Sequence, residues 1–151
     1  MKTSLIKRLV ATTAGLSPLA LRVPVGIIFA AHGAQKLFGW FGGYGLEGTG
    51  QWMASIGIEP GMLMAALAGG AEFFGGLALL LGLLVRPAAA VLGFTMLVAI
   101  FSVHIGNGLF MKNNGIEFGL ALLAATISLL VSGAGRLSAD AALAGQLGPQ
   151  R

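Results

Sequence analysis

The stretch RVPVGIIFAAHGAQKLFGW, residues 22–40, decides the fold. It begins as an apolar segment rich in small residues, as a membrane-spanning helix does, and then carries His32, Gln35 and Lys36 within five residues. Polar and ionisable side chains are costly in hydrocarbon, so a helix that keeps three of them turns them toward protein or water. We therefore expect other helices to present polar groups to the same region.

The composition is that of an integral membrane protein. Of the 151 residues, 56% are hydrophobic and 9% are charged, and the mean hydropathy is +0.90, whereas a soluble domain has roughly 45–50% apolar and 25% charged residues. The basic residues are scattered and not interleaved with aromatic residues, so the expected partner is the lipid bilayer and not nucleic acid. The chain has no cysteine, which excludes a disulfide or a cysteine-ligated cofactor within it.

Four apolar segments have close to the roughly 20 residues that cross a bilayer. Proline stands at or near the first turn of three of them, where its missing amide hydrogen is harmless. We therefore predict an all-α, polytopic membrane protein, an antiparallel bundle of four transmembrane helices. The predicted spans are residues 19–40, 60–84, 87–105 and 116–133.

The basic residues orient this bundle. With the N-terminus in the cytoplasm, seven of the nine basic residues lie inside and only Lys36 and Lys112 lie outside, as the positive-inside rule requires. Both termini are therefore expected in the cytoplasm. The inside group comprises Lys2, Lys7, Arg8, Arg22, Arg86, Arg136 and Arg151.

The chain divides into three predicted parts, a cytoplasmic amphipathic segment (1–18), the transmembrane domain (19–133) and a cytoplasmic tail (134–151). A signal peptide is disfavoured because the first apolar run is short and no clear cleavage site follows it. In the outer first loop, Thr49 is predicted to cap a short amphipathic helix that reaches about Ile56 and forms a candidate lid, with its apolar side chains at the membrane interface.

Glycines within the spans are interpreted as packing positions, because small residues let helix backbones approach closely in a bilayer. An aromatic belt is expected at one membrane interface, formed by Trp40, Phe41, Tyr44 and Trp52. The glycines in question include Gly26, Gly33, Gly69, Gly70, Gly75, Gly76, Gly82 and Gly93.

Polar residues from all four spans fall in the outer half of the membrane. His32 and Lys36 lie one turn apart on the same face of the first span, and Glu72 lies near the middle of the second. His104 ends the third span and Glu117 begins the fourth. The same outer layer also contains Gln35, Asn107, Asn113 and Asn114.

Structural roles compete with chemical ones at these positions. His104, Glu117 and the asparagines lie close enough to the interface to be solvated helix ends, and Lys36 can extend toward water. His32 can be an interior histidine whose hydrogen bonds are satisfied. Glu72 is too deep to reach water and requires a proton or a partner, for which Lys36 and His32 are the economical candidates.

Three runs resemble the DoxX family of small bacterial inner-membrane proteins: Arg22 through HGAQKLFGWFGGYG, AGGAEFFGGLALLLGLLVRPAA, and SGAGRLSAD. The resemblance covers about residues 19–141 in matching order and implies a multi-pass protein of the bacterial cytoplasmic (inner) membrane. Family members are described as candidate oxidoreductases, some as the membrane subunit of a thiosulfate:quinone oxidoreductase and others as parts of redox-stress complexes. The signature positions it implies are Arg22, His32, Gly33, Lys36, Glu72, Arg86, Gly135, Arg136, Ser138 and Asp140.

The leading functional prediction is a quinone-linked redox subunit with an outward-facing polar pocket. Glu72, His32 and Lys36 are the predicted catalytic residues, with Glu72 as the proton carrier and Lys36 or His32 as the anchor of a quinone carbonyl. We predict no metal site. We do predict a soluble redox partner protein and homo-oligomers. Whether the chain is an oxidoreductase itself or a non-catalytic subunit stays open. The predicted cofactor-binding residues are Gln35, His104, Glu117 and Asn107.

Two other classes of function stay open. One is a small-molecule or proton-coupled carrier, or a membrane adaptor that recruits a soluble redox enzyme, although the sequence shows no inverted repeat with paired broken helices. The other is haem ligation by His32 and His104, the only two histidines. Haem is the least favoured, because Lys and Glu nearby can serve the same pocket without a metal.

Overall fold

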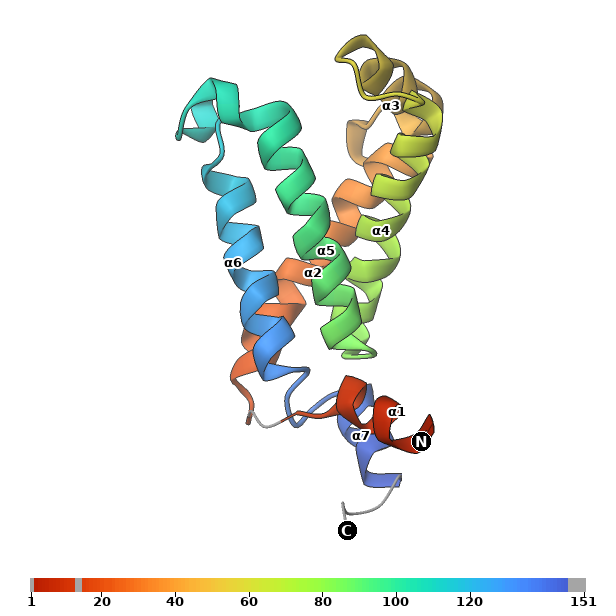
Figure 1. Cartoon of the computed structure of the whole chain (residues 1–151), viewed down its shortest axis with the longest axis vertical. Helices are drawn as coiled ribbons and strands as arrows, with labels where there is room; N and C mark the ends of the chain where they lie inside the picture. The colour runs from red at the N-terminus through yellow and green to blue at the C-terminus, as the bar shows by residue number, and fades with distance from the viewer. Residues whose placement is uncertain (1, 13–14, 147–151) are drawn as a thin grey trace.

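The computed structural model describes residues 2–12 and 15–146, and every regular element in these ranges is helical (Figure 1). The bundle consists of α2 (Ser17–Phe38), α4 (Gly61–Leu81), α5 (Val85–Ala99) and α6 (Glu117–Ser132). These helices match the four predicted apolar segments. Three shorter helices lie at the ends of the bundle: α1 (Lys2–Val10), α3 (Gly45–Ser55) and α7 (Ala139–Gln146).

Three of the helical segments are long and apolar enough to cross a membrane: α2, α4 and the stretch Val85–Asn107. This stretch extends α5 by a π-helical turn, Ile100–His104, and a 3₁₀ turn, Ile105–Asn107. The fourth predicted span, α6, has 16 residues and a length of about 24 Å. It is therefore shorter than the roughly 30 Å of hydrocarbon that a span must cross.

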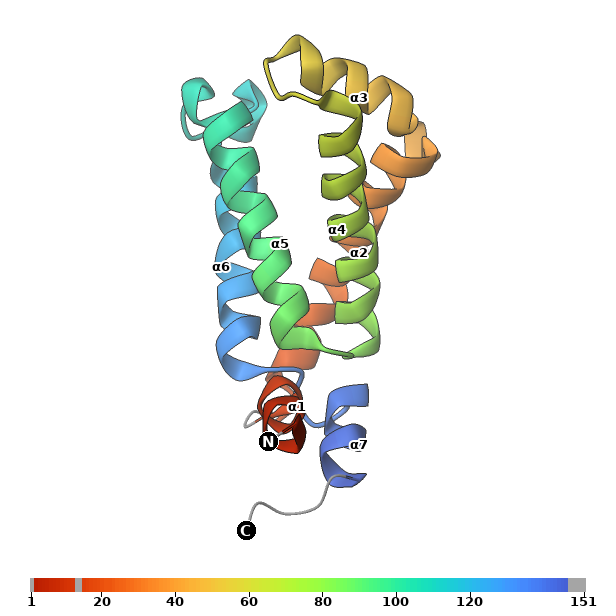
Figure 2. The ribbon, with the colours of Figure 1, turned by 45° about the vertical axis from the view of Figure 1, so that its right-hand side comes forward.

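The four long helices form two pairs that meet at one end and separate at the other (Figures 1 and 2). α2 packs along α4, and α5 packs along α6. The narrow end carries α1 and α7, whereas α3 lies over the α2–α4 pair at the wide end. The buried apolar core lies where the pairs meet and comprises Val25, Phe29, Leu79, Val85, Ala89, Leu92, Met96, Leu122, Leu129 and Ala134.

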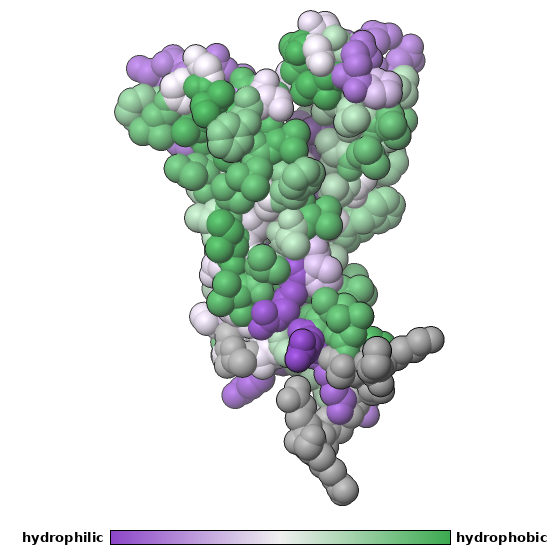
Figure 3. All heavy atoms as spheres, in the orientation of Figure 1, coloured by the Kyte–Doolittle hydropathy of each residue, from purple (hydrophilic) through white to green (hydrophobic). Residues whose placement is uncertain are grey.

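The surface is that of a protein surrounded by lipid. Figure 3 shows hydrophobic side chains over the flanks of the bundle and hydrophilic ones toward its two ends. The aromatic residues predicted to form a belt are all exposed at the wide end, from 42% for Trp52 to 82% for Tyr44. Amphipathic rings of this kind are enriched where a membrane meets water.

Glycines bring the backbones of α2 and α4 into direct contact. A Cβ atom on Gly33 would lie 2.3 Å from the backbone nitrogen of Phe73, and one on Gly76 would lie 2.4 Å from that of Ala30. Neither position has room for any side chain. The interpretation of these glycines as packing positions is confirmed, but it is wrong for Gly70, where an added Cβ would meet nothing within 4 Å.

Arg22 is buried at the narrow end, where its guanidinium binds backbone carbonyls from two distant segments. Nη1 donates to the carbonyls of Leu79 and Leu80, each at 2.7 Å, near the end of α4. Nε donates to Ala134 at 3.1 Å, and Nη2 donates to Leu137. With only 2% of its surface exposed, Arg22 is a buried cross-link between helices. The sequence placed Arg22 on the cytoplasmic side and among the signature positions, but it did not indicate this cross-link.

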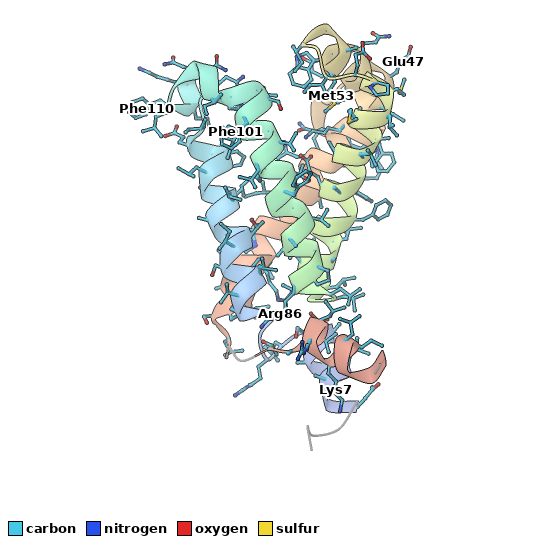
Figure 4. All side chains as sticks on the ribbon, viewed as in Figure 1. Lys7, Glu47, Met53, Arg86, Phe101 and Phe110 are labelled. Carbon is cyan, nitrogen blue, oxygen red and sulfur yellow. The ribbon has the colours of Figure 1, made fainter. Side chains whose placement is uncertain are left out.

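Asp140 and Arg86 extend this arrangement, and with Arg22 they form what we call the basal network. The carboxylate of Asp140 accepts hydrogen bonds from the backbone of Leu84 and Val85, at 2.7 and 3.0 Å, and so caps the start of α5. Arg86 donates to one carbonyl of α6 and one of the α1–α2 connection, at 2.8 and 2.9 Å. Lys7 and Arg86, labelled in Figure 4, both lie at this end.

Two expectations about the ends of the bundle need correction. Thr49 does not cap α3, because the helix begins at Gly45 and the threonine is buried within it. Met53 does not lie at the interface but is buried, with 8% of its surface exposed.

The predicted tail contains α7 and contributes Asp140 to the basal network. The division of the chain into three parts stays a prediction.

We expect Gly33→Ala to destabilise the bundle by roughly 1–3 kcal/mol, because the added methyl group would force α2 away from α4. Gly70→Ala is the matched control, since it adds the same group to α4 where nothing lies within 4 Å. Thermal unfolding in detergent, followed by helical circular dichroism, measures both. Equal melting temperatures for the two variants would contradict the proposed backbone contact.

Candidate functional site

Lys36 and Glu72 form an ion pair between α2 and α4. The Nζ atom of Lys36 lies 2.6 Å from Oε2 of Glu72, and the two side chains are 25% and 5% exposed. Their approach depends on the glycine contact, since a Cβ on Gly69 would lie 3.1 Å from Cβ of Lys36. The sequence predicted that Glu72 has either a proton or a partner, and the structure shows a partner. Of the two candidates, the structure selects Lys36.

A cavity of about 460 Å³ lies between the α2–α4 pair and the α5–α6 pair. Figure 3 shows the surface hollowed between the two arms of the wide end, and Figure 4 shows Met53 on the inner side of one arm. Most of the lining is apolar, with aromatic, aliphatic and methionine side chains. The polar residues of the lining are His32, Lys36, Glu72, Thr95, Ser102, His104 and Asn114.

His32 lies on the cavity wall one helical turn before Lys36, as predicted. Its ring centroid is 6.1 Å from that of Phe118 on α6, and the two ring planes are tilted by 50°. This contact joins the two helix pairs across the cavity. The exposed surface of His32 therefore faces a partly enclosed space.

His104 reaches the same cavity from the π-helical turn after α5. Its Nδ1 atom lies 2.9 Å from the backbone carbonyl oxygen of Asn114, and Asn107 Nδ2 donates to that same oxygen at 3.2 Å. The carboxylate of Glu117 accepts from the backbone nitrogen of Met111 at 2.5 Å. These bonds hold the connection between α5 and α6 in place.

The structure thus brings together four of the seven predicted site residues, namely His32, Lys36, Glu72 and His104. The other three do not line the cavity. Gln35 donates to the carbonyl of Phe41 at 3.2 Å and holds the turn after α2, and Asn107 and Glu117 hold the α5–α6 connection. Side chains at helix ends commonly bond to nearby backbone groups, and hydropathy patterns do not reveal which ones do so.

Sequence reasoning missed part of the cavity wall. Thr95 and Ser102 line it from α5 and the π-helical turn. Their spacing of seven residues places both on one face of a helix, and this is the only signal that could have indicated them. Three of the chain's six methionines also line the cavity, and their flexible thioethers suit an adaptable apolar wall. These methionines are Met53, Met96 and Met111.

Fold and site together define a multi-pass helical membrane protein in which an ion pair lies on the wall of a largely apolar cavity. Comparison with known proteins identifies its family, since residues 17–105 match the model of the DoxX family. The chain belongs to the DoxX family, as its sequence motifs predict.

Three bacterial proteins are similar to the chain, and two of them are named as inner membrane proteins. It is 34% identical to "Putative oxidoreductase CatD" of Bacillus subtilis, over 83% of this chain and 85% of that protein. It is 36% identical to the inner membrane protein YqjF of Escherichia coli, over 72% of this chain and 82% of that one. It is 31% identical to the inner membrane protein YphA of Escherichia coli, over 81% of this chain and 86% of that one. No solved structure matches the chain. The predicted location, a multi-pass protein of the bacterial inner membrane, is confirmed.

The ion pair allows a test by removal of one or both charges. We expect Lys36→Met to destabilise the protein by about 3 kcal/mol, because it leaves the buried carboxylate of Glu72 without a partner. The double variant Lys36→Met/Glu72→Leu is expected to recover most of that loss, since it removes both charges. Melting temperatures in detergent measure the effect, with the exposed Lys112→Met as the control. A double variant no more stable than Lys36→Met would contradict this account.

Proposed function

We propose that this DoxX-family protein is a quinone-linked redox subunit whose cavity holds the quinone head group. The observation that supports this function is the Lys36–Glu72 ion pair on the wall of an apolar cavity within a membrane protein. Ionisable side chains in such positions commonly mark pathways for substrates or protons. The provisional oxidoreductase name of the Bacillus subtilis relative agrees with this class of chemistry.

The cavity suits a quinone in size and in lining. Its volume of about 460 Å³ falls within the roughly 300–1,000 Å³ of small-molecule sites. A quinone head group has polar oxygens at its edges, an apolar ring and an apolar tail. Lys36 can donate to one of those oxygens, while methionine and phenylalanine side chains contact the ring. The exposed apolar flanks of the helices suit the tail.

The proposed chemistry separates proton transfer from electron transfer. A bound quinone supplies the redox chemistry, since it takes up two electrons and two protons to become the quinol. Glu72 exchanges protons between its carboxylic acid and carboxylate forms, and Lys36 holds the oxygen that receives a proton. Because the chain contains no cysteine with which to hold an iron–sulfur cluster, we propose a soluble redox protein as the electron donor.

We also propose four crossings, with both termini in the cytoplasm. α6 packs along α5 and returns the chain from the wide end to the narrow end. Its shortness can be accommodated by local thinning of the bilayer. Lys7, Arg8 and Arg136 lie in or beside the helices of the narrow end, which therefore becomes the cytoplasmic side under the positive-inside rule. The cavity then opens toward the outer leaflet.

Binding of a quinone can be measured through Trp52, which lies on the cavity wall and is the only tryptophan in a Trp40→Phe background. In lipid nanodiscs, a quinone with a decyl tail is expected to quench its fluorescence with saturation. Lys36→Met/Glu72→Leu removes the polar anchor and should weaken binding at least tenfold, whereas Lys112→Met should not.

Quenching that does not saturate would refute quinone binding at this site. So would quenching with the same affinity in the double variant as in the background protein. Two measurements on the same purified protein separate the alternatives. A Soret band in its absorption spectrum would favour haem, and solute flux into proteoliposomes would favour a carrier.

The topology can be tested by labelling because the chain has no cysteine. Gln51→Cys in α3 and Gln146→Cys in α7 each introduce one thiol at an exposed position at opposite ends of the bundle. A membrane-impermeant maleimide applied to spheroplasts should label Gln51→Cys and not Gln146→Cys until the cells are lysed. Labelling of both before lysis would be incompatible with the proposed orientation.

A further inference from the structure

The cavity has a second polar wall, which the α5–α6 pair supplies. Three consecutive residues, Ser102, Val103 and His104, line the cavity there. All three belong to the π-helical turn Ile100–His104. A π turn contains one more residue than an α turn and so widens the helix face locally, and such turns often occur at functional sites. This wall faces the one that carries Lys36 and Glu72.

The hydrogen bond of His104 determines what its ring can offer the cavity. A carbonyl oxygen can only accept a hydrogen bond, so the Nδ1 atom that lies 2.9 Å from the carbonyl of Asn114 must carry a hydrogen. In the neutral ring, Nε2 is then the atom with a free lone pair. Among the residues that the structure describes, Nε2 has no hydrogen-bond partner. His104, which lines the cavity, therefore has a free acceptor atom in Nε2.

The two walls thus differ in hydrogen-bonding character. Lys36 has only N–H donors, which suit a carbonyl or phenolate oxygen. The Nε2 atom of His104 suits a hydroxyl group. Ser102 also lines the cavity, but its hydroxyl can donate or accept and does not discriminate between ligands.

We propose that His104 contacts the ligand through Nε2 and selects the reduced, hydroxyl-bearing form of the ring, the quinol, over the quinone. This inference rests on the proposed function. A quinone has two carbonyl oxygens and no hydrogen to donate, so it leaves Nε2 unpaired. A quinol donates one hydroxyl hydrogen to Nε2 while its other oxygen accepts from Lys36.

Two substitutions separate the acceptor from the loop anchor. In His104→Asn, the side-chain amide takes the place of Nδ1 and can still donate to the Asn114 carbonyl, but nothing replaces Nε2. In His104→Gln, the longer amide brings its oxygen to the place of Nε2 and gives up the Nδ1 bond. In both variants the connection between α5 and α6 keeps its other hydrogen bond, the one from Asn107 to the Asn114 carbonyl.

The measurement is anaerobic titration of Trp52 fluorescence in nanodiscs, with a decyl-tailed quinol and the corresponding quinone. In the Trp40→Phe background, and in the same background with Lys112→Met, the quinol should bind more tightly than the quinone. His104→Asn should lose about tenfold in quinol affinity with less than twofold change for the quinone, and His104→Gln should keep the preference.

Any other pattern overturns the inference. Loss in His104→Gln with retention in His104→Asn would mean that His104 only anchors the connection, and retention in both would mean that Nε2 does not contact the ligand. Saturable quinone binding without any effect of His104 would refute this inference alone. If the Trp40→Phe protein binds neither quinol nor quinone, both this inference and the proposed function are refuted.

Discussion

The direct backbone contact between α2 and α4 is the constraint on which the site depends. At Gly33 and Gly76 the two backbones touch, and at Gly69 the side chains of α2 pack directly on the backbone of α4. The resulting separation lets Lys36 reach Glu72. Helices in lipid gain little from hydrophobicity, because lipid tails are as apolar as their side chains, so close packing and polar contacts must hold them together. The same contact therefore supplies cohesion for the bundle and geometry for the ion pair.

The two ends of the bundle use polar groups for different purposes. At the narrow end, Arg22 and Asp140 bind backbone carbonyls and N–H groups that helix ends leave unpaired, and backbone groups within a membrane must be satisfied by protein. This network holds both helix pairs together at one end. Because the narrow end is held by this network, the two helix pairs can separate at the wide end and leave room for the cavity without loss of the fold.

Stability alone does not explain the ion pair. A buried salt bridge seldom stabilises a protein more than apolar residues of the same volume would, which is why we include Lys36 and Glu72 in the proposed binding site. The match to the DoxX family covers residues 17–105. This region contains His32, Lys36 and Glu72 on one wall and His104 on the other, whereas Phe118, which meets His32 from α6, lies beyond it.

The sequence by itself determined the class of protein, the positions of the long helices and the residues that are costly in lipid. Hydropathy and helical period carry that information, because each depends on residues close together in the chain. Only the tertiary structure decided that Glu72 pairs with Lys36 and not with His32, and that Arg22 is buried. It also decided that Gln35, Asn107 and Glu117 bond to local backbone and not to the cavity. Helical period shows which face a residue occupies, but its neighbour is set by how closely two helices far apart in the sequence pack.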